Sequence, residues 1–388
     1  MFKNTVLFFF VIVFTSLSYT LQAQILTGAD QPEKYLPLLK DKKVGILTNQ
    51  TGVVNYEDTL IHLVDFLINN KIDVKKIYAP EHGFRGTADA GELIKDGKDT
   101  KTGLPIISLY GKNKKPNNQQ LAGIDIMLFD LQDVGARFYT YISSLHYLME
   151  ACAENNIPVI ILDRPNPIGS TIDGPILESS QKSFVGMHPI PVLHGLTIGE
   201  YAQMINGEKW LAKGITCELI VIACENYSKD KHYSLPVKPS PNLPNDQSIK
   251  LYASLCFFEG TNVSVGRGTE SQFQIYGSPF IKNANFSFTP KPNHGAKDPM
   301  HNGKKCFGED LTLYEKAPGL ELKWLISAYK NTTDKEQFFN NFFNKLAGNS
   351  SLQHQIKSGK TEEEIKKSWT SDLSKFKEKR AKYLIYKE

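Results

Sequence analysis

Three ionisable side chains lie close together in residues 80–86, which read Pro-Glu-His-Gly-Phe-Arg-Gly and directly follow an apolar run. Burying such groups is costly, so a strand that ends in Glu81, His82 and Arg85 points to binding or catalysis. Helix capping by the acid and the glycines is the alternative that this segment alone leaves open.

An acid in this position could break a glycosidic bond. One carboxylic acid protonates the leaving oxygen, while a second group, or the acetamide of the substrate, stabilises the positive charge that develops at the anomeric carbon. Glu81 suits the role of general acid. Asp130 and Asp163 are the candidates for the second catalytic group, and the choice between a retaining, an inverting and a substrate-assisted mechanism stays open.

The elements that must position these residues are short β-rich runs that alternate with amphipathic segments. The expected strands are residues 44–48, 74–78, 106–110, 126–129, 159–162 and 219–222. Apolar spacings of three and four predict helices around Leu60 to Leu67, Leu145 to Cys152 and Ile198 to Ile205. This alternation predicts a Rossmann-like, doubly wound α/β fold with a mostly parallel sheet.

Polar side chains follow four of these strands, at the point where each strand ends. They are Asn49, Glu81 with His82, Asp130 with Asp133, and Asp163 with Arg164 and Asn166. Ligands of open α/β sheets bind beyond the carboxyl ends of the strands, so we expect the four strand ends to share one pocket.

A second domain is expected after residues 238–244, where Pro and Asn interrupt regular structure. The sequence therefore predicts a Rossmann-like catalytic domain at residues 24–237 and a smaller α+β domain at residues 238–388 that closes the cleft. Residues 259–270 are rich in Gly and small polar side chains, and we expect Glu259, Arg267 and Glu270 to reach across the cleft.

Several functions are disfavoured by missing signals. No G-x-G-x-x-G opens the helix after the first strand, and neither a P-loop nor a G-x-S-x-G elbow is present. The net charge of +4 is spread along the chain, so nucleic acid is not an expected partner. No cofactor is expected, and the spacing of His294, His301 and Cys306 matches no familiar metal site.

Residues 1–23 have the layout of a secretory signal peptide. Lys3 precedes an apolar run at residues 6–14, and Leu-Gln-Ala at residues 21–23 offers a cleavage point. We expect export to the periplasm or the extracellular space without stable membrane insertion after cleavage, because the run is short and no Cys follows it. The odd number of cysteines, five, leaves at least one free thiol.

Five longer motifs, in this order, resemble one family, the NamZ-type exo-β-N-acetylmuramidases (formerly DUF1343; glycoside hydrolase family 171). The motifs are residues 45–52, 80–86, 130–141, 163–167 and 259–270. The resemblance spans nearly the whole mature chain. It implies removal of N-acetylmuramic acid from the non-reducing end of peptidoglycan fragments, with Glu81 matching the catalytic Glu and His82 assisting it. Ser170 stands where a second glycine is expected, a local difference in one loop.

A muramyl substrate also fits the arginines. Its lactyl carboxylate can be held by a planar guanidinium through two parallel hydrogen bonds. The candidates are Arg85, Arg137, Arg164 and Arg267, with a structural ion pair as the alternative for each. Tyr139 could stack on a sugar ring or belong to the core. The expected substrate-binding set is completed by Asn49, Asn166, His194, Glu259 and Glu270.

Two other functions stay open. One is a metal-dependent hydrolase with Glu81, His82, Asp130 and Asp163 as ligands, which a chelator would inactivate. The other is a non-catalytic periplasmic sugar-binding protein, which would hold sugar without turnover.

Overall fold

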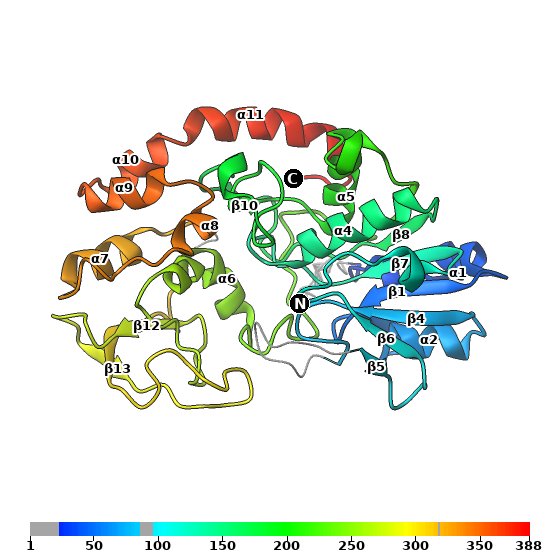
Figure 1. The fold of residues 1–388 in the computed structure, drawn as a ribbon, viewed down its shortest axis with the longest axis horizontal. Helices are drawn as coiled ribbons and strands as arrows, with labels where there is room; N and C mark the ends of the chain where they lie inside the picture. Colours follow the sequence, from blue (N-terminus) through cyan, green and yellow to red (C-terminus); the bar gives the residue numbers. More distant parts are fainter. Residues whose placement is uncertain (1–22, 86–95, 317–318) are drawn as a thin grey trace, which may run out of the picture.

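The centre of the molecule is a seven-stranded sheet with the order β11-β8-β7-β1-β4-β6-β5 (Figure 1). The computed structural model describes residues 23–85, 96–316 and 319–388. The strands are β1 (Val44–Thr48), β4 (Val74–Ala79), β5 (Gly97–Lys98), β6 (Pro105–Ser108), β7 (Ile126–Asp130), β8 (Val159–Leu162) and β11 (Leu219–Ile222). Six are the predicted strands and run parallel, whereas β5 is an antiparallel edge. The predicted α/β class is confirmed.

Helices cover both faces of the sheet, as a doubly wound fold requires. Successive side chains of a strand point to opposite faces, so Ile46 packs in one apolar core and Leu47 in the other. The helices α1 (Pro32–Leu39) and α2 (Leu63–Asn69) belong to the first core, and α4 (Tyr141–Glu154) and α5 (Ile198–Gly207) to the second. A short α3 (Asn118–Leu121) precedes β7.

One predicted helix begins later than its apolar spacing indicated. Leu60 lies in a hairpin of β2 (Val53–Tyr56) and β3 (Thr59–His62), where it is 51% exposed. Glu57 and Asp58 both have positive φ, at 49° and 59°, and form the turn of this hairpin. Helix α2 begins only after His62, whose side chain caps it by accepting a hydrogen bond from the Val64 amide.

The rest of the chain forms a smaller α+β region beside the first, at the left of Figure 1. Its antiparallel sheet has the order β12-β14-β13. Its elements are α6 (Asp246–Leu255), β12 (Ile275–Ser278), β13 (Phe286–Phe288), β14 (Cys306–Asp310), α7 (Lys323–Asn331), α8 (Phe343–Ala347), α9 (Ser351–Lys357), α10 (Glu362–Lys367) and α11 (Thr370–Arg380). The boundary predicted between residues 237 and 238 falls in irregular structure between β11 and α6 and stays a prediction.

The C-terminal segment returns to the first region. Helix α11 runs along the top of the molecule in Figure 1, and the chain then ends beside α5. Arg380 donates hydrogen bonds to the Gly195 carbonyl from Nε and Nη2, and the Tyr386 hydroxyl donates to Asp163 at 2.7 Å. The chain therefore passes between the two regions twice, once before α6 and once along α11, whose last residue is Arg380 (Figure 1).

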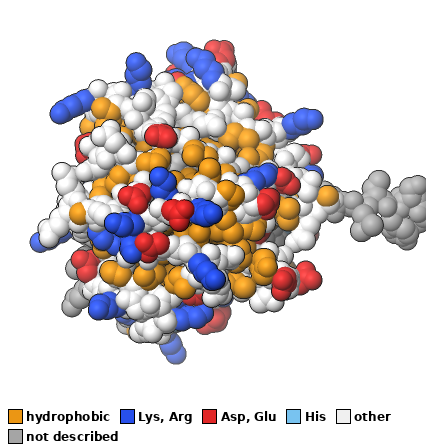
Figure 2. Space-filling model, turned by 90° about the vertical axis from the view of Figure 1, so that its right-hand side faces the viewer, with side chains coloured by type: hydrophobic (Ala, Val, Ile, Leu, Met, Phe, Trp, Pro, Cys, Tyr) orange, Lys and Arg blue, Asp and Glu red, His pale blue; other side chains and the backbone are white. Residues whose placement is uncertain are grey.

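Several smaller expectations can be compared with the structure. All five cysteines are free and buried. A small hairpin of β9 (Ile172–Asp173) and β10 (Leu193–His194) precedes α5, which begins at a capping box of Thr197 and Glu200. Basic, acidic and hydrophobic side chains are interspersed on the face shown in Figure 2. None of the helices in the described residues has the length and apolar character needed to span a bilayer. The expected signal sequence lies almost entirely outside the described residues.

Candidate active site

A pocket of about 630 Å³ lies between the carboxyl end of the parallel sheet and the smaller region. The loops after β4, β6 and β7 form one wall, and residues around α6 and the loop before β12 form the other. The lining includes Glu81, His82, Tyr110, Lys114, Tyr139, Thr140, Tyr141, Phe184, Tyr252, Glu259, Arg267, Phe273 and Asp298. The pocket thus combines carboxylates, cations and aromatic rings.

Glu81 is held in this pocket by two hydroxyl groups from neighbouring strand ends. Its Oε1 accepts a 2.9 Å hydrogen bond from Tyr110, which follows β6, and its Oε2 accepts a 2.7 Å bond from Thr140, which precedes α4. Burial, followed by the charge of Glu81, raises the pKa of Tyr110, so the phenol stays protonated and acts as a donor. These bonds fix the orientation of the carboxylate toward the pocket.

His82 lies in a tight turn that directly follows Glu81. The Gly83 amide donates to the Pro80 carbonyl at 3.1 Å, and His82 has φ of 69°. A positive φ costs a side-chain-bearing residue about 1–2 kcal/mol. The imidazole is 5% exposed and lines the pocket, so a strained residue stands beside the candidate acid.

Tyrosine rings form the floor of the pocket and are themselves hydrogen-bonded. The Tyr139 hydroxyl donates to the Pro239 carbonyl at 2.8 Å, and the Tyr139 and Tyr141 ring centroids lie 4.7 Å apart. Asn49 does not line the pocket, but its amide donates to the Tyr141 hydroxyl at 2.6 Å. Asn49 therefore supports the pocket from behind.

Glu259 and Arg267 face the pocket from the smaller region, as expected for residues that reach across the cleft. Arg267 contacts one oxygen of Glu259, Oε1, through two nitrogens. Its Nε donates a 2.8 Å hydrogen bond to this oxygen, and its Nη2 lies 2.7 Å from it. Burial opposes the charge of Arg267, but Glu259 prevails and raises the pKa of this guanidinium. Glu270 is exposed and does not line the pocket.

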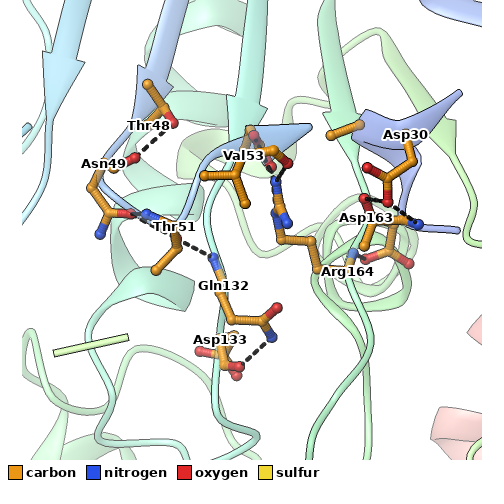
Figure 3. A network of polar contacts seen from close by, with 12 residues as sticks. Asp30, Thr48, Asn49, Thr51, Val53, Gln132, Asp133, Asp163 and Arg164 are labelled. Carbon is orange, nitrogen blue, oxygen red and sulfur yellow. Dashed lines mark hydrogen bonds and ion pairs between the residues drawn. The ribbon is translucent and has the colours of Figure 1, made fainter. Parts of the chain in front are cut away.

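Asp130 and Arg164 pair with each other, and Arg164 is labelled in Figure 3 beside Val53. Arg164 donates to Asp130 Oδ1 at 2.6 Å and to Oδ2 at 3.0 Å, and also to the Val53 carbonyl at 2.8 Å. Asp130 has no exposed surface, and Arg164 is 3% exposed. The structure therefore places neither side chain in the pocket, and the guanidinium is used by a structural ion pair.

Asp163 and Asn166 are also used within the fold. Asp163 accepts hydrogen bonds from the hydroxyls of Thr197 and Tyr386, both at 2.7 Å, and from the Gly199 amide at 2.8 Å. Burial raises its pKa to about 6, although these hydrogen bonds oppose the shift. Asn166 donates to the Leu196 carbonyl at 3.1 Å. Neither side chain reaches the pocket.

The strand-end loops are tied to one another by a further network, seen at the left of Figure 3. Asn49 Oδ1 accepts a 2.6 Å hydrogen bond from the Thr51 hydroxyl. The oxygen of that hydroxyl accepts a 3.0 Å hydrogen bond from the backbone amide of Gln132. Gln132 in turn donates to the Pro165 carbonyl at 2.8 Å. Most of the polar strand-end residues therefore hold the scaffold, while Glu81 and His82 face the pocket.

Arg137 joins the two regions. It is fully buried and donates to four carbonyl oxygens: Pro175 and Ile190 at 2.7 Å, Leu346 at 2.9 Å and Ala347 at 2.8 Å. The last two end α8, where a cation is favoured by the helix dipole. Burial lowers the Arg137 pKa to about 9. Its guanidinium is not in the pocket.

Arg85 and His194 lie elsewhere as well. Arg85 forms an ion pair with Asp99 at 2.9 Å and does not line the pocket. His194 is 1% exposed, and its Nδ1 accepts a 3.2 Å hydrogen bond from the Leu196 amide. Burial, with smaller effects from nearby cations, lowers the pKa of His194 to about 3, so the ring is neutral.

The polar lining residues that were not expected from the sequence include Tyr110, Lys114, Thr140, Ser240, Tyr252 and Asp298. Tyr110 is the last residue of the expected strand 106–110, and Thr140 lies near the end of the motif at residues 130–141, so inspection of both segments to their ends would have included them. Asp298 lies in a long loop with no distinguishing pattern. Within the described residues, no three His, Cys, Asp or Glu side chains are grouped as a metal ligand set would be. The four side chains of the metal-hydrolase alternative are thus not brought together.

An acid held among aromatic rings, in a pocket at the edge of an α/β sheet, is an arrangement that a carbohydrate-cleaving hydrolase can use. Residues 44–247 match the N-terminal domain, and residues 250–386 the C-terminal domain, of the family described as exo-β-N-acetylmuramidase NamZ. The chain belongs to this family of glycosidases, and the resemblance noted in the sequence is confirmed.

Known relatives agree with this membership over almost the whole chain. The peptidoglycan β-N-acetylmuramidase NamZ of Bacillus subtilis (strain 168) is 40% identical over 387 residues, covering 94% of this chain and 92% of the relative. A crystal structure of a DUF1343 family protein from Bacteroides fragilis NCTC 9343 is 44% identical, with a TM-score of 0.86 over 94% of this chain and 100% of that one. A second crystal structure of a DUF1343 family protein from the same organism is 30% identical and has a TM-score of 0.78. The match covers 94% of this chain and 99% of that one.

Proposed function

We propose that the protein is an exo-acting glycosidase that releases N-acetylmuramic acid from the non-reducing end of peptidoglycan fragments, with Glu81 as the general acid. The observation that carries this assignment is the position of Glu81, which is oriented into the pocket by Tyr110 and Thr140. Support for the substrate comes from the Bacillus subtilis relative, whose name describes a peptidoglycan β-N-acetylmuramidase.

In this proposal Glu81 gives its proton to the oxygen of the leaving sugar as the glycosidic bond breaks. Tyr110 and Thr140 hold the carboxyl group in the orientation required for the transfer. His82 lies next to the acid and contributes a second polar group on the same wall. The tyrosine rings provide apolar faces on which a pyranose can stack.

The second catalytic group is sought among residues of the pocket, since Asp130 and Asp163 are engaged in the scaffold. Glu259 and Asp298 are the further carboxylates of the lining, and the acetamide of the substrate is the third candidate. The anomeric configuration of the first product, followed by NMR, distinguishes inversion from the two retaining routes.

We also propose that the protein is exported and acts in cell-wall turnover, in the periplasm or outside the cell. The support is the signal-like sequence of residues 1–23 together with the family membership.

The test is turnover of a chromogenic N-acetylmuramide by the wild type and the Glu81→Gln variant, which keeps the shape of the side chain but removes the acid. We expect turnover to fall by about 10²–10⁴-fold, the usual contribution of a general acid. Glu270→Gln, at an exposed carboxylate outside the pocket, is the matched control and should retain full activity. Undiminished turnover by Glu81→Gln would refute the assignment.

The two alternatives are examined in the same assay. Inactivation by a chelator, reversed by a divalent metal, would favour a metal-dependent hydrolase. Saturable binding of N-acetylmuramic acid with no turnover of any glycoside would favour a sugar-binding protein.

A further inference from the structure

The basic side chains described in the pocket lining differ in whether an acidic side chain pairs with them. Among the residues that the structure describes, the lining includes two cations, Lys114 and Arg267, together with three carboxylates. Arg267 directs two of its nitrogens at one oxygen of Glu259, so both its charge and part of its hydrogen-bonding fork are already used. A ligand carboxylate that approached Arg267 would have to compete with Glu259 at close range.

Lys114 differs from Arg267, since no acidic side chain of the described residues pairs with it. Its Nζ lies 4.6 Å from the centroid of the Phe184 ring, and within the described part of the chain no carboxylate is at ion-pair distance from it. The next residue, Lys115, differs in this respect, because it pairs with Glu150 at 2.8 Å and Glu154 at 2.7 Å. A cation on an aromatic face keeps its full charge and its donors, since the ring contributes attraction without neutralisation.

Lys114 also stands on the wall that holds the acid. It shares the loop after β6 with Tyr110, and the ring beneath it, Phe184, lies 6.3 Å from the Tyr110 ring. The Tyr110 hydroxyl donates to Glu81. In a muramyl residue the scissile bond at C1 and the lactyl ether at C3 belong to one pyranose ring, so the groups that recognise them must lie within one sugar of each other.

We propose that Lys114 binds the carboxylate of the substrate and thereby selects N-acetylmuramic acid over N-acetylglucosamine. This inference rests on the proposed function and names the residue that sets its specificity. The shared chemistry is a carboxylate, which is supplied by the lactyl group of a free muramide or by the stem peptide of a muramyl peptide. The ammonium group on its flexible stem can reach either position.

The experiment compares kcat/KM for chromogenic N-acetylmuramide, its lactyl amide, a muramyl peptide glycoside and N-acetylglucosaminide. Lys114→Met keeps an unbranched side chain that is one atom shorter and removes the charge. We expect it to lower kcat/KM for the free muramide by about 10- to 100-fold, the range for losing a charged hydrogen-bond partner, and to leave the glucosaminide unchanged. Lys114→Arg should recover most of the loss, and Lys112→Met, at an exposed lysine outside the pocket, should have no effect.

The other substrates of this comparison show which carboxylate Lys114 binds. Equal losses for all four substrates, or no loss for any, would overturn the inference. A loss for the muramyl peptide but not for the free muramide would assign Lys114 to the stem peptide. Calorimetry on the Glu81→Gln variant, with and without Lys114→Met, measures binding of N-acetylmuramic acid and therefore reports on Lys114 without any hydrolysis. If the wild type hydrolyses no glycoside, the proposed function is refuted, and the calorimetric result for Lys114 still stands.

Discussion

Thr140 occupies the N-cap position of α4, yet its hydroxyl donates to Glu81 Oε2 at 2.7 Å instead of capping the helix. An N-cap threonine ordinarily accepts a hydrogen bond from an amide of the first turn, which stabilises the helix by about 1 kcal/mol. Here the side chain makes no cap bond. The residue is thus used to position the candidate acid, and the helix is anchored by the packing of its buried face.

Replacing Thr140 by Val should therefore affect turnover more than stability. We expect kcat to fall about tenfold, because a hydrogen bond that orients Glu81 is lost. KM should change little, and the urea midpoint should stay close to that of the wild type, since no cap is removed. Thr140→Ser restores the hydroxyl and should recover most of the activity. An unchanged kcat in Thr140→Val would show that the hydrogen bond from Thr140 is not needed to orient the acid.

His82 allows backbone strain and side-chain chemistry to be separated. Its φ of 69° suits glycine, so in His82→Gly about 1–2 kcal/mol of relieved backbone strain should offset part of the stability lost with the contacts of the buried imidazole. Activity should nevertheless fall by at least tenfold, because the imidazole lines the pocket beside Glu81. Thermal unfolding and steady-state kinetics on the same preparation check both parts. Full activity in His82→Gly would reduce the role of this residue to shaping the turn.

The buried pair of Asp130 and Arg164 should contribute strongly to stability. In Arg164→Leu the Asp130 carboxylate is left without its partner at a position with no solvent exposure, which should cost about 3–5 kcal/mol of unfolding free energy. Adding Asp130→Leu to the same protein should recover part of the loss, because no charge is then buried. Lys375→Ala breaks an exposed pair with Asp372 and should cause no measurable change. Urea titrations distinguish these outcomes.

Protonation of His62 should make part of the free energy of unfolding sensitive to acid. Burial lowers its folded pKa from 6.5 to about 4, so the unfolded chain takes up the proton first. Stability from this group is complete above pH 6.5 and is lost as the pH falls toward 4, with a total of about 3 kcal/mol. His62→Asn keeps an N-cap acceptor for Val64 and does not titrate. Between pH 7 and 4.5 the variant should therefore lose less stability than the wild type. Parallel curves for the two proteins would contradict the shift.

The sheet was largely predictable because its strands are short apolar runs with a clear period, and the boundaries of five of the six agree to within one residue. The run ending at Tyr110 was placed too long, since β6 stops at Ser108 and frees Tyr110 to reach Glu81. The hairpin at Leu60 was missed because an apolar spacing over so few residues fits either a helix or an exposed strand.

The side chains that follow the strands were harder to assign. A strand-end carboxylate looks the same in sequence whether it faces a pocket, as Glu81 does, or is covered, as Asp163 is. The difference depends on partners far along the chain: Tyr386, which covers Asp163, is 223 residues away. The same holds for Arg137, which reaches α8 across 209 residues.

The return of the C-terminal segment has a consequence for the timing of biosynthesis. A chain is made from its N-terminus, and one of the three donors to Asp163, the Tyr386 hydroxyl, is made 223 residues after the acid that it contacts. Until Tyr386 has been made, the buried Asp163 of the first region lacks one of its hydrogen-bond donors.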